Sequence, residues 1–102
     1  MRRVVVTGVG LVSSLGTGVE KTWEALLKGE TGIKLIESFD TEDLAVKMAG
    51  VVDDFNPEDF GIDKKELKKL ARFSQFGIAA SKMALDDSGL IIDEHNAERI
   101  GV

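Results

Sequence analysis

The run from Val4 to Gly16 constrains the fold of this chain more than any other stretch. It reads VVVTGVGLVSSLG, and its apolar, β-branched residues are too continuous for a strand with one face in water. Such a run is typical of a central strand that helices cover on both faces. We therefore predict a buried strand over residues 4–12, followed by a glycine-rich turn.

A helix is expected directly after this turn, over residues 18–28. Thr17 and Glu20 have the spacing of a capping box, in which each side chain binds the other residue's backbone amide. Gly29 is placed to end the helix in the left-handed conformation. The helix carries one apolar stripe: Val19, Trp23, Leu26 and Leu27. This spacing favours core packing for Trp23 over a place in a binding site.

A second strand is predicted over residues 46–52. Gly50 inside it indicates a bulge or the close approach of another backbone. Pro57, the only proline, stands where a new element can begin. Residues 30–43 carry no pattern that assigns them.

A second long helix is predicted over residues 73–88, because its apolar residues keep helical spacing until Gly89 supplies a stop. Small residues crowd it: Gly77, Ala79, Ala80, Ser81 and Ala84. They would let another backbone approach closely, so we expect this helix to be buried. Residues 98–102 are expected to begin a further strand.

Length and composition indicate one domain at most. A chain of 102 residues buries roughly 60–65% of its unfolded surface, enough for one modest core. No apolar run reaches the roughly 18 residues of a membrane span, and no secretory signal is recognisable. The absence of cysteine agrees with a cytoplasmic protein without disulfides. The net charge of −5 argues weakly against nucleic acid or an anionic membrane as the main partner.

The glycine turn Gly8-Val9-Gly10 allows two interpretations. In a nucleotide-binding domain at Gly8–Gly16, the glycines would let the backbone approach a pyrophosphate at a helix N-terminus. Ser13 occupies the third glycine position of that pattern, and the helix signal begins only near Thr17. The favoured interpretation is structural: the glycines let a buried strand bend or lie close to a neighbouring backbone.

A cluster of cations follows Asp63, which together with Glu66 can cap a short helix. In a helix the spacing i, i+3, i+4, i+7 places four cations on one face: Lys65, Lys68, Lys69 and Arg72, with Lys64 nearby. Residues 63–72 hold five cations and two carboxylates, a net charge of +3. Since the whole chain has a net charge of −5, the remaining residues carry −8. This face is either a docking site for an acidic partner or a solvated helix face.

No conventional catalytic set is present. His95 is the only histidine, lies in a polar stretch, and has no cysteine or second histidine to act with. The serines lack the G-x-S-x-G context of a hydrolase nucleophile. We therefore assign no catalytic, cofactor-binding or metal-binding residue to this chain.

An ordered set of motifs nevertheless spans all 102 residues. It runs RRVVVTGVG, SSLG, E-x-x-W-x-x-L-x-x-G-x-x-GI, FDT, KMAG, DFN, RFSQFG, DDSG and RIG. The set resembles the opening of the β-ketoacyl-acyl-carrier-protein synthases, most closely the type II condensing enzymes.

The resemblance implies that the chain is the N-terminal part of the first half of a thiolase-like fold, a layered αβαβα structure that is incomplete at 102 residues. It also implies a cytoplasmic homodimer, an acyltransferase of fatty acid biosynthesis. Such enzymes condense an acyl chain, held on a cysteine, with malonyl on the acyl carrier protein. The cysteine, two histidines and a lysine of that chemistry would lie downstream, and His95 aligns with neither histidine.

One functional element carries over by resemblance. The basic helix that receives the acidic carrier protein in this family resembles residues 63–72, which assigns docking to Lys65, Lys68 and Lys69, with Lys64 and Arg72 sharing the role. Two alternatives stay open for the chain as a whole. They are a small non-catalytic α/β domain that binds an acidic protein, and a nucleotide-binding domain at Gly8–Gly16.

Overall fold

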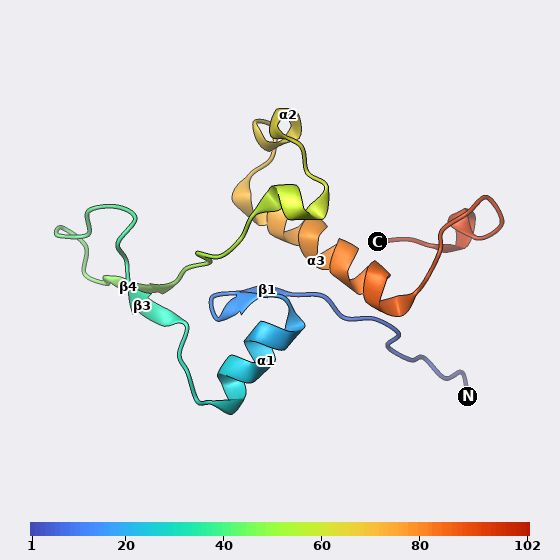
Figure 1. Cartoon of the computed structure of the whole chain (residues 1–102), viewed down its shortest axis with the longest axis horizontal. Helices are drawn as coiled ribbons and strands as arrows, with labels where there is room; N and C mark the ends of the chain where they lie inside the picture. Colours follow the sequence, from blue (N-terminus) through green and yellow to red (C-terminus); the bar gives the residue numbers. More distant parts are fainter.

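The computed structural model describes all residues, 1–102, as a mixed α/β chain without a continuous sheet (Figure 1). Two helices, α1 (Val19–Leu27) and α3 (Arg72–Ser88), are joined by shorter elements. Strands β1 (Val12–Ser13) and β2 (Gly16–Thr17) form one antiparallel hairpin, and β3 (Ile33–Leu35) and β4 (Met48–Gly50) form another. The remaining elements are single turns: η1 (Pro57–Phe60), α2 (Lys64–Leu67) and η2 (Ala97–Arg99).

The glycine turn packs directly against α3. A Cβ built on Gly10 would lie 2.7 Å from the Ala84 amide nitrogen, and one on Gly8 would lie 2.7 Å from the Ser88 amide nitrogen. The Val9 amide, between the two glycines, donates a hydrogen bond of 2.9 Å to Asp87 Oδ2. The interpretation that the glycines lie close to a neighbouring backbone is therefore confirmed, as is the stop of α3 at Gly89, where φ is 68°. The expected burial of α3 is wrong for this chain, because only Gln75 and Ala79 of the helix are buried.

The residues just before the glycine turn are exposed. Val4, Val5 and Val6 are 93%, 65% and 82% exposed, and no hydrogen bond ties the backbone before Val9 to the rest of the chain. The predicted buried strand over residues 4–12 is thus wrong for this chain, since only Val12 lies in a strand. The physical reason is that none of these 102 residues lies beside the valines as a partner strand.

Helix α1 begins and ends within one residue of its predicted bounds, and Gly29 follows it with φ of 71°. The capping box is wrong, because Gly18 occupies the N-cap without a side-chain bond and the Thr17 hydroxyl instead donates to Asp54 Oδ1 at 3.1 Å. The expected core position of Trp23 is also wrong. That side chain is 59% exposed, because the face that packs on the hairpin is the one with Thr22 and Ala25.

The predicted strand over residues 46–52 is shorter in the structure, where β4 pairs with β3 from the unassigned region. The register sets Ile33 opposite Gly50. Ser14, in the turn of the first hairpin, reaches this pair: its Oγ would lie 3.3 Å from a Cβ on Gly50, and its Cβ 2.9 Å from one on Gly32. The prediction of a bulge or a close backbone at Gly50 is wrong, because the β3–β4 register is continuous and the atoms nearest to Gly50 belong to the side chains of Ser14 and Ile33. The contact with Ser14 joins the two hairpins.

The best-packed apolar cluster lies between η1 and α3. Phe55 is 7% exposed, stacks on Phe60 with centroids 5.6 Å apart, and meets Phe76 edge-on at 5.0 Å. Ile62, which follows η1, is also buried, at 2% exposure. Pro57 begins η1, as predicted, with the Asn56 side chain accepting from the Glu58 amide.

The C-terminal residues form turns instead of the predicted strand over residues 98–102. Asp93 accepts hydrogen bonds from the amides of His95 and Asn96, and η2 follows. A strand needs a neighbour, and none lies beside residues 98–102 in this chain. His95 is exposed in this turn, where the sequence placed it on the surface.

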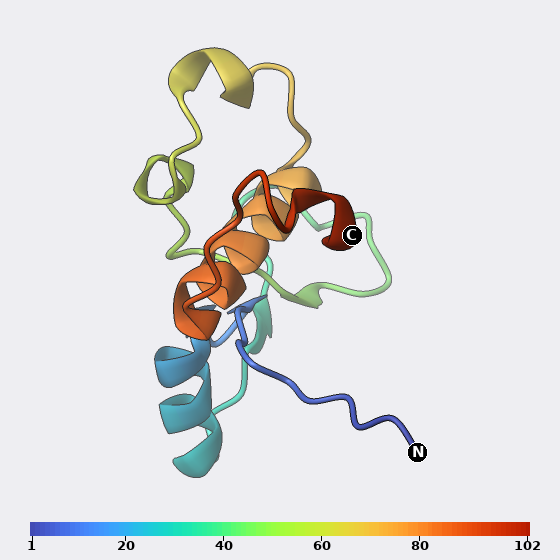
Figure 2. The ribbon, with the colours of Figure 1, turned by 90° about the vertical axis from the view of Figure 1, so that its right-hand side faces the viewer.

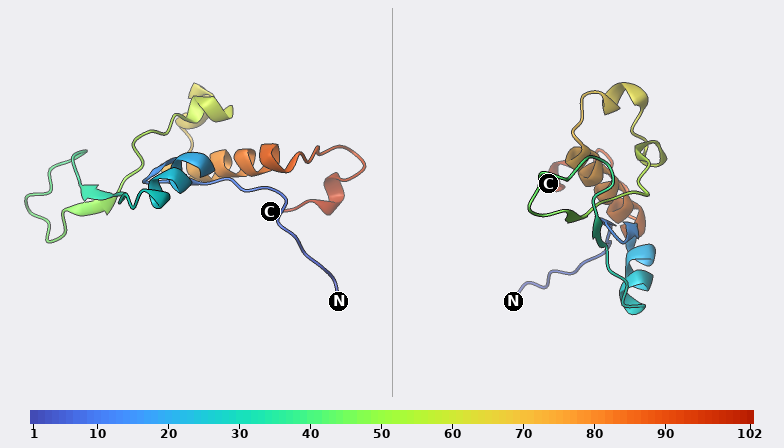
Figure 3. Two further views of the ribbon diagram at one scale, coloured as in Figure 1. Left: turned by 60° about the horizontal axis from the view of Figure 1, so that its bottom comes forward. Right: turned by 90° about the vertical axis from the view of Figure 1, so that its left-hand side faces the viewer.

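The chain is open in shape, with extents of 55 × 37 × 25 Å. The N-terminal residues trail away from the helices (Figure 2), and the β3–β4 loop and the C-terminal turns lie at opposite ends of the long axis (Figure 3). The radius of gyration is 17.1 Å, whereas a compact chain of this length has about 13 Å. The helix α3 covers part of both sequence-distant segments, the glycine turn and η1. No helix has the length and apolar character that a membrane crossing requires.

Candidate functional site

The predicted docking cations lie on a projecting stretch, residues 63–70, which we call the lysine segment (Figure 1, α2). Asp63 caps α2, its Oδ1 accepting from the amides of Lys65 at 2.9 Å and Glu66 at 3.0 Å. The helix ends at Leu67, and its C-cap residue Lys68 keeps αR geometry. The expected single helix face with Arg72 on it is therefore wrong, because Arg72 begins a separate helix.

The lysines of this segment are exposed and nearly free of internal partners. Lys64 Nζ lies 4.0 Å from Glu58 Oε1, the outer limit of an ion pair, and both groups face water. Lys65, Lys68 and Lys69 make no ion pair with any carboxylate of the chain. Their charges are available to an external acidic group, although salt screens exposed charges over about 10 Å.

Arg72 has a different environment from the lysines. Its guanidinium carbon lies 5.1 Å from the ring centroids of both Phe55 and Phe76, and Nη2 donates to the Val52 carbonyl at 3.4 Å. Both ring distances are those of cation–π contacts. This cluster was not predicted from the sequence, where the signal for it is an arginine directly before an aromatic helix stripe.

A second polar cluster centres on Asp54. Its carboxylate accepts from the Thr17 amide at 3.2 Å, from the Thr17 hydroxyl at 3.1 Å and from Lys21 Nζ at 3.3 Å. Partial burial alone would raise the pKa of Asp54, but the bonds from Thr17 and the Lys21 charge together lower it below the ordinary 3.8. The cluster ties the start of α1 to the segment before η1, so its role is structural.

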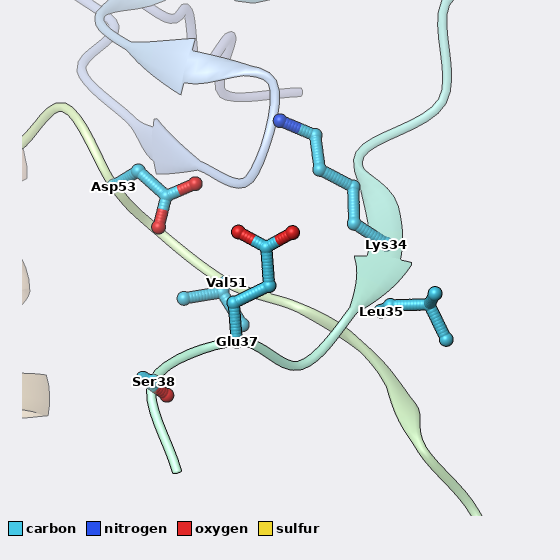
Figure 4. A pocket seen from close by; sticks show the side chains of 6 residues that line it. All are labelled: Lys34, Leu35, Glu37, Ser38, Val51 and Asp53. Atoms are coloured by element: carbon cyan, nitrogen blue, oxygen red, sulfur yellow. The ribbon is translucent and has the colours of Figure 1, made fainter.

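The hollow in Figure 4 has a volume of about 460 Å³ and is lined by Lys34, Leu35, Glu37, Ser38, Val51 and Asp53. The charged ends of Lys34, Glu37 and Asp53 turn towards it, whereas Leu35 points away. None of the three forms an ion pair within 4.0 Å. An open hollow with two carboxylates suits neither a nucleotide nor an acyl chain.

The geometry does not favour the nucleotide-binding alternative. Gly8 and Gly10 face the backbone of α3, so a pyrophosphate has no room beside them. The turn is also separated from the first turn of α1 by the whole β1–β2 hairpin. The chain brings no three His, Cys, Asp or Glu side chains together as metal ligands.

This chain matches several known ketosynthases. Residues 1–102 match the family described as "Beta-ketoacyl synthase, N-terminal domain". The chain is 50% identical over 101 residues to "3-oxoacyl-[acyl-carrier-protein] synthase 2" of Vibrio harveyi, covering 99% of this chain and 24% of that protein. It is 48% identical over 101 residues to the protein of the same name from Staphylococcus aureus strain COL, with the same coverage.

A solved structure agrees with these relatives. The chain resembles "The ishigamide ketosynthase/chain length factor" with a TM-score of 0.77 and 43% sequence identity, over 88% of this chain and 22% of that one. The chain therefore spans about a quarter of the length of the relatives that it matches.

Proposed function

This chain belongs to the β-ketoacyl synthase family, and from that membership we propose that it is the N-terminal part of a 3-oxoacyl-[acyl-carrier-protein] synthase of type II. In this proposal, residues 1–102 lie in the first half of a thiolase-like αβαβα fold within a cytoplasmic homodimer. The complete enzyme joins an acyl thioester to malonyl on the carrier protein, with loss of carbon dioxide, during fatty acid elongation. The chain has no cysteine, so the nucleophile belongs to another part of that enzyme.

The large exposed surface of this chain supports the proposal that other parts of a larger protein cover it. Its accessible area is 8508 Å², whereas a self-contained protein of 11.0 kDa exposes about 5,600 Å². Many large apolar side chains are exposed, including the valines of residues 4–6 and the Trp23 stripe. A free-standing α/β domain is less well supported, since only eight of 102 residues are buried.

In the proposed enzyme, these residues supply framework and carrier docking. The docking proposal is supported by the exposure of Lys65, Lys68 and Lys69 in one short segment, where none of them makes an ion pair within the chain. An acidic carrier would be steered towards this local positive charge, mainly through a faster association rate. Lys64 is a weaker candidate, because it already faces Glu58.

Charge reversal in the complete synthase tests this proposal. Lys65→Glu, Lys68→Glu and Lys69→Glu together should lower the association rate of the carrier at low salt by about a hundredfold, and by less at high salt. The matched control reverses Lys28, Lys34 and Lys47, three exposed lysines elsewhere, with the same change in net charge. Equal losses in the two triple variants would leave only a general charge effect and contradict a docking site.

A further inference from the structure

The lysine segment is anchored to the rest of the chain at both ends. Before it, Ile62 is 2% exposed, and its amide donates a hydrogen bond of 3.3 Å to the Pro57 carbonyl in η1. After it, Gln75 Nε2 donates to the Leu70 carbonyl at 3.2 Å, and Arg72 reaches both Phe55 and Phe76. Between these anchors the segment contains only the single turn of α2. A turn this short does not hold its conformation alone, so its position depends on the anchors.

The contacts of Arg72 are those that a planar guanidinium makes best. Two ring centroids lie at the same distance of 5.1 Å, and Phe55 and Phe76 stand at 85° to one another. The same group donates to the Val52 carbonyl. A lysine ammonium is a compact charge that neither stacks on a ring nor reaches ring and carbonyl with a rigid fork.

An arginine that docked the carrier would have to leave these partners for a carboxylate of the partner. The lysines of the segment give up little, because three of them have no internal ion pair and Lys64 has only the long contact with Glu58. The two kinds of cation in residues 63–72 are thus placed for different tasks.

We infer that Arg72 is a positioning residue that fixes the C-terminal end of the lysine segment on the rings of Phe55 and Phe76, and is not itself a docking cation. The effect on carrier binding rests on the proposed function, whereas the effect on the segment does not. Arg72 acts through the lysines: it sets where their charges stand relative to α3.

Hydrogen exchange of the amides of residues 64–69 in the complete synthase measures how firmly Arg72 holds the lysine segment. Arg72→Lys keeps the charge but loses the planar stack, and Arg72→Gln loses both. Each should make these amides exchange about fivefold faster, since a cation–π contact at an exposed site has that effect on local opening. Arg99→Lys is the control, because Arg99 is exposed and touches no ring. Unchanged exchange in Arg72→Lys would overturn the inference.

A double-mutant cycle identifies the partner ring. Phe76→Leu keeps an apolar side chain but removes one of the two rings, so it should also accelerate exchange. If Arg72 acts through this ring, the double variant Arg72→Lys with Phe76→Leu exchanges more slowly than the product of the two single effects requires. Strictly multiplicative effects would mean that the guanidinium and the ring act independently, against the inference.

Turnover separates positioning from docking and from chemistry. Arg72→Lys should raise KM for the carrier-bound substrate about twofold with kcat unchanged, because only the lysines move and no reacting atom is touched. If Arg72 were a docking cation, Arg72→Lys would match the wild type in KM and Arg72→Gln would not. Failure of the lysine reversals described above would remove the docking function yet leave the exchange result intact, so the two proposals fail separately.

Discussion

Val4, Val5 and Val6 are 65–93% exposed, whereas Gly8 and Gly10, a few residues further on, are packed so closely against α3 that neither has room for a Cβ. Both groups belong to one stretch whose composition indicates burial. The difference is that these 102 residues contain a partner for the glycines, the small-residue face of α3, and none for the valines. Burial thus follows the presence of a complementary surface, and composition indicates only the need for one.

The largest expected effect comes from a charge in the valine stretch. If the rest of a complete synthase covers residues 4–6, Val6→Asp should destabilise that protein by about 4 kcal/mol, because a buried carboxylate without a partner is costly. Chemical denaturation of the complete protein measures it. A change within about 0.5 kcal/mol, as at an ordinary surface position, would show that the valines stay in water and would contradict a covering surface.

The second largest effect is expected where the glycine turn packs against α3. Gly10→Val places a side chain where a Cβ already lies 2.7 Å from Met83 Cβ and from the Ala84 amide. The glycine turn would have to move away from α3, which should lower the free energy of unfolding by about 3 kcal/mol, the upper end of the range for overpacking. Gly101→Val is the control, since nothing lies within 4 Å of a Cβ there. Similar melting temperatures for the two variants would argue against the tight crossing.

The smallest effect is expected at the Asp54 cluster, which ties the packed half of the N-terminal stretch to the segment before η1. The pKa of Asp54 is lowered in the folded chain, so its contribution is present above the ordinary value of 3.8 and is lost as the pH falls through the lowered pKa. Its side chain is 41% exposed, which limits the contribution to at most about 1 kcal/mol.

Asp54→Asn should therefore lower stability at pH 7 and bring the variant and the wild type closer together at pH 2. Denaturant titrations at the two pH values measure the gap. A gap that widens on acidification would reverse the sign expected from the lowered pKa and would remove Asp54 as the acceptor of this cluster.

Sequence predicted the helix ends well because the signals for ending a helix are local. Gly29 and Gly89 adopt the left-handed conformation that few other residues tolerate, and Asp63 caps α2 through amides two and three residues away. The capping box at Thr17 is wrong for the opposite reason. Asp54, 37 residues further along the chain, takes the Thr17 hydroxyl, and a local pattern cannot contain that competitor.

The candidate site was predicted in part. The local excess of cations is visible in the sequence, and the docking role of Lys65, Lys68 and Lys69 stays a prediction. The single helix face predicted for these lysines together with Arg72 is wrong, because α2 ends at Leu67 and Arg72 begins a separate helix. The prediction from helical spacing required one continuous helix over residues 65–72. Arg72 instead contacts Phe55 and Phe76, which are distant from one another in sequence, so a local pattern could not reveal its different environment.

The order in which these segments are synthesised gives the exposed valines a further consequence. At about 5–20 residues per second, the 102 residues take about 5–20 s to be synthesised, and none of them covers residues 4–6 during that interval. An uncharged β-branched run is prone to pair with other nascent chains during that interval. Arg2 and Arg3 stand directly before it, exposed and alike in charge. Two cations at that edge repel a second copy and act as gatekeepers until the remaining chain arrives.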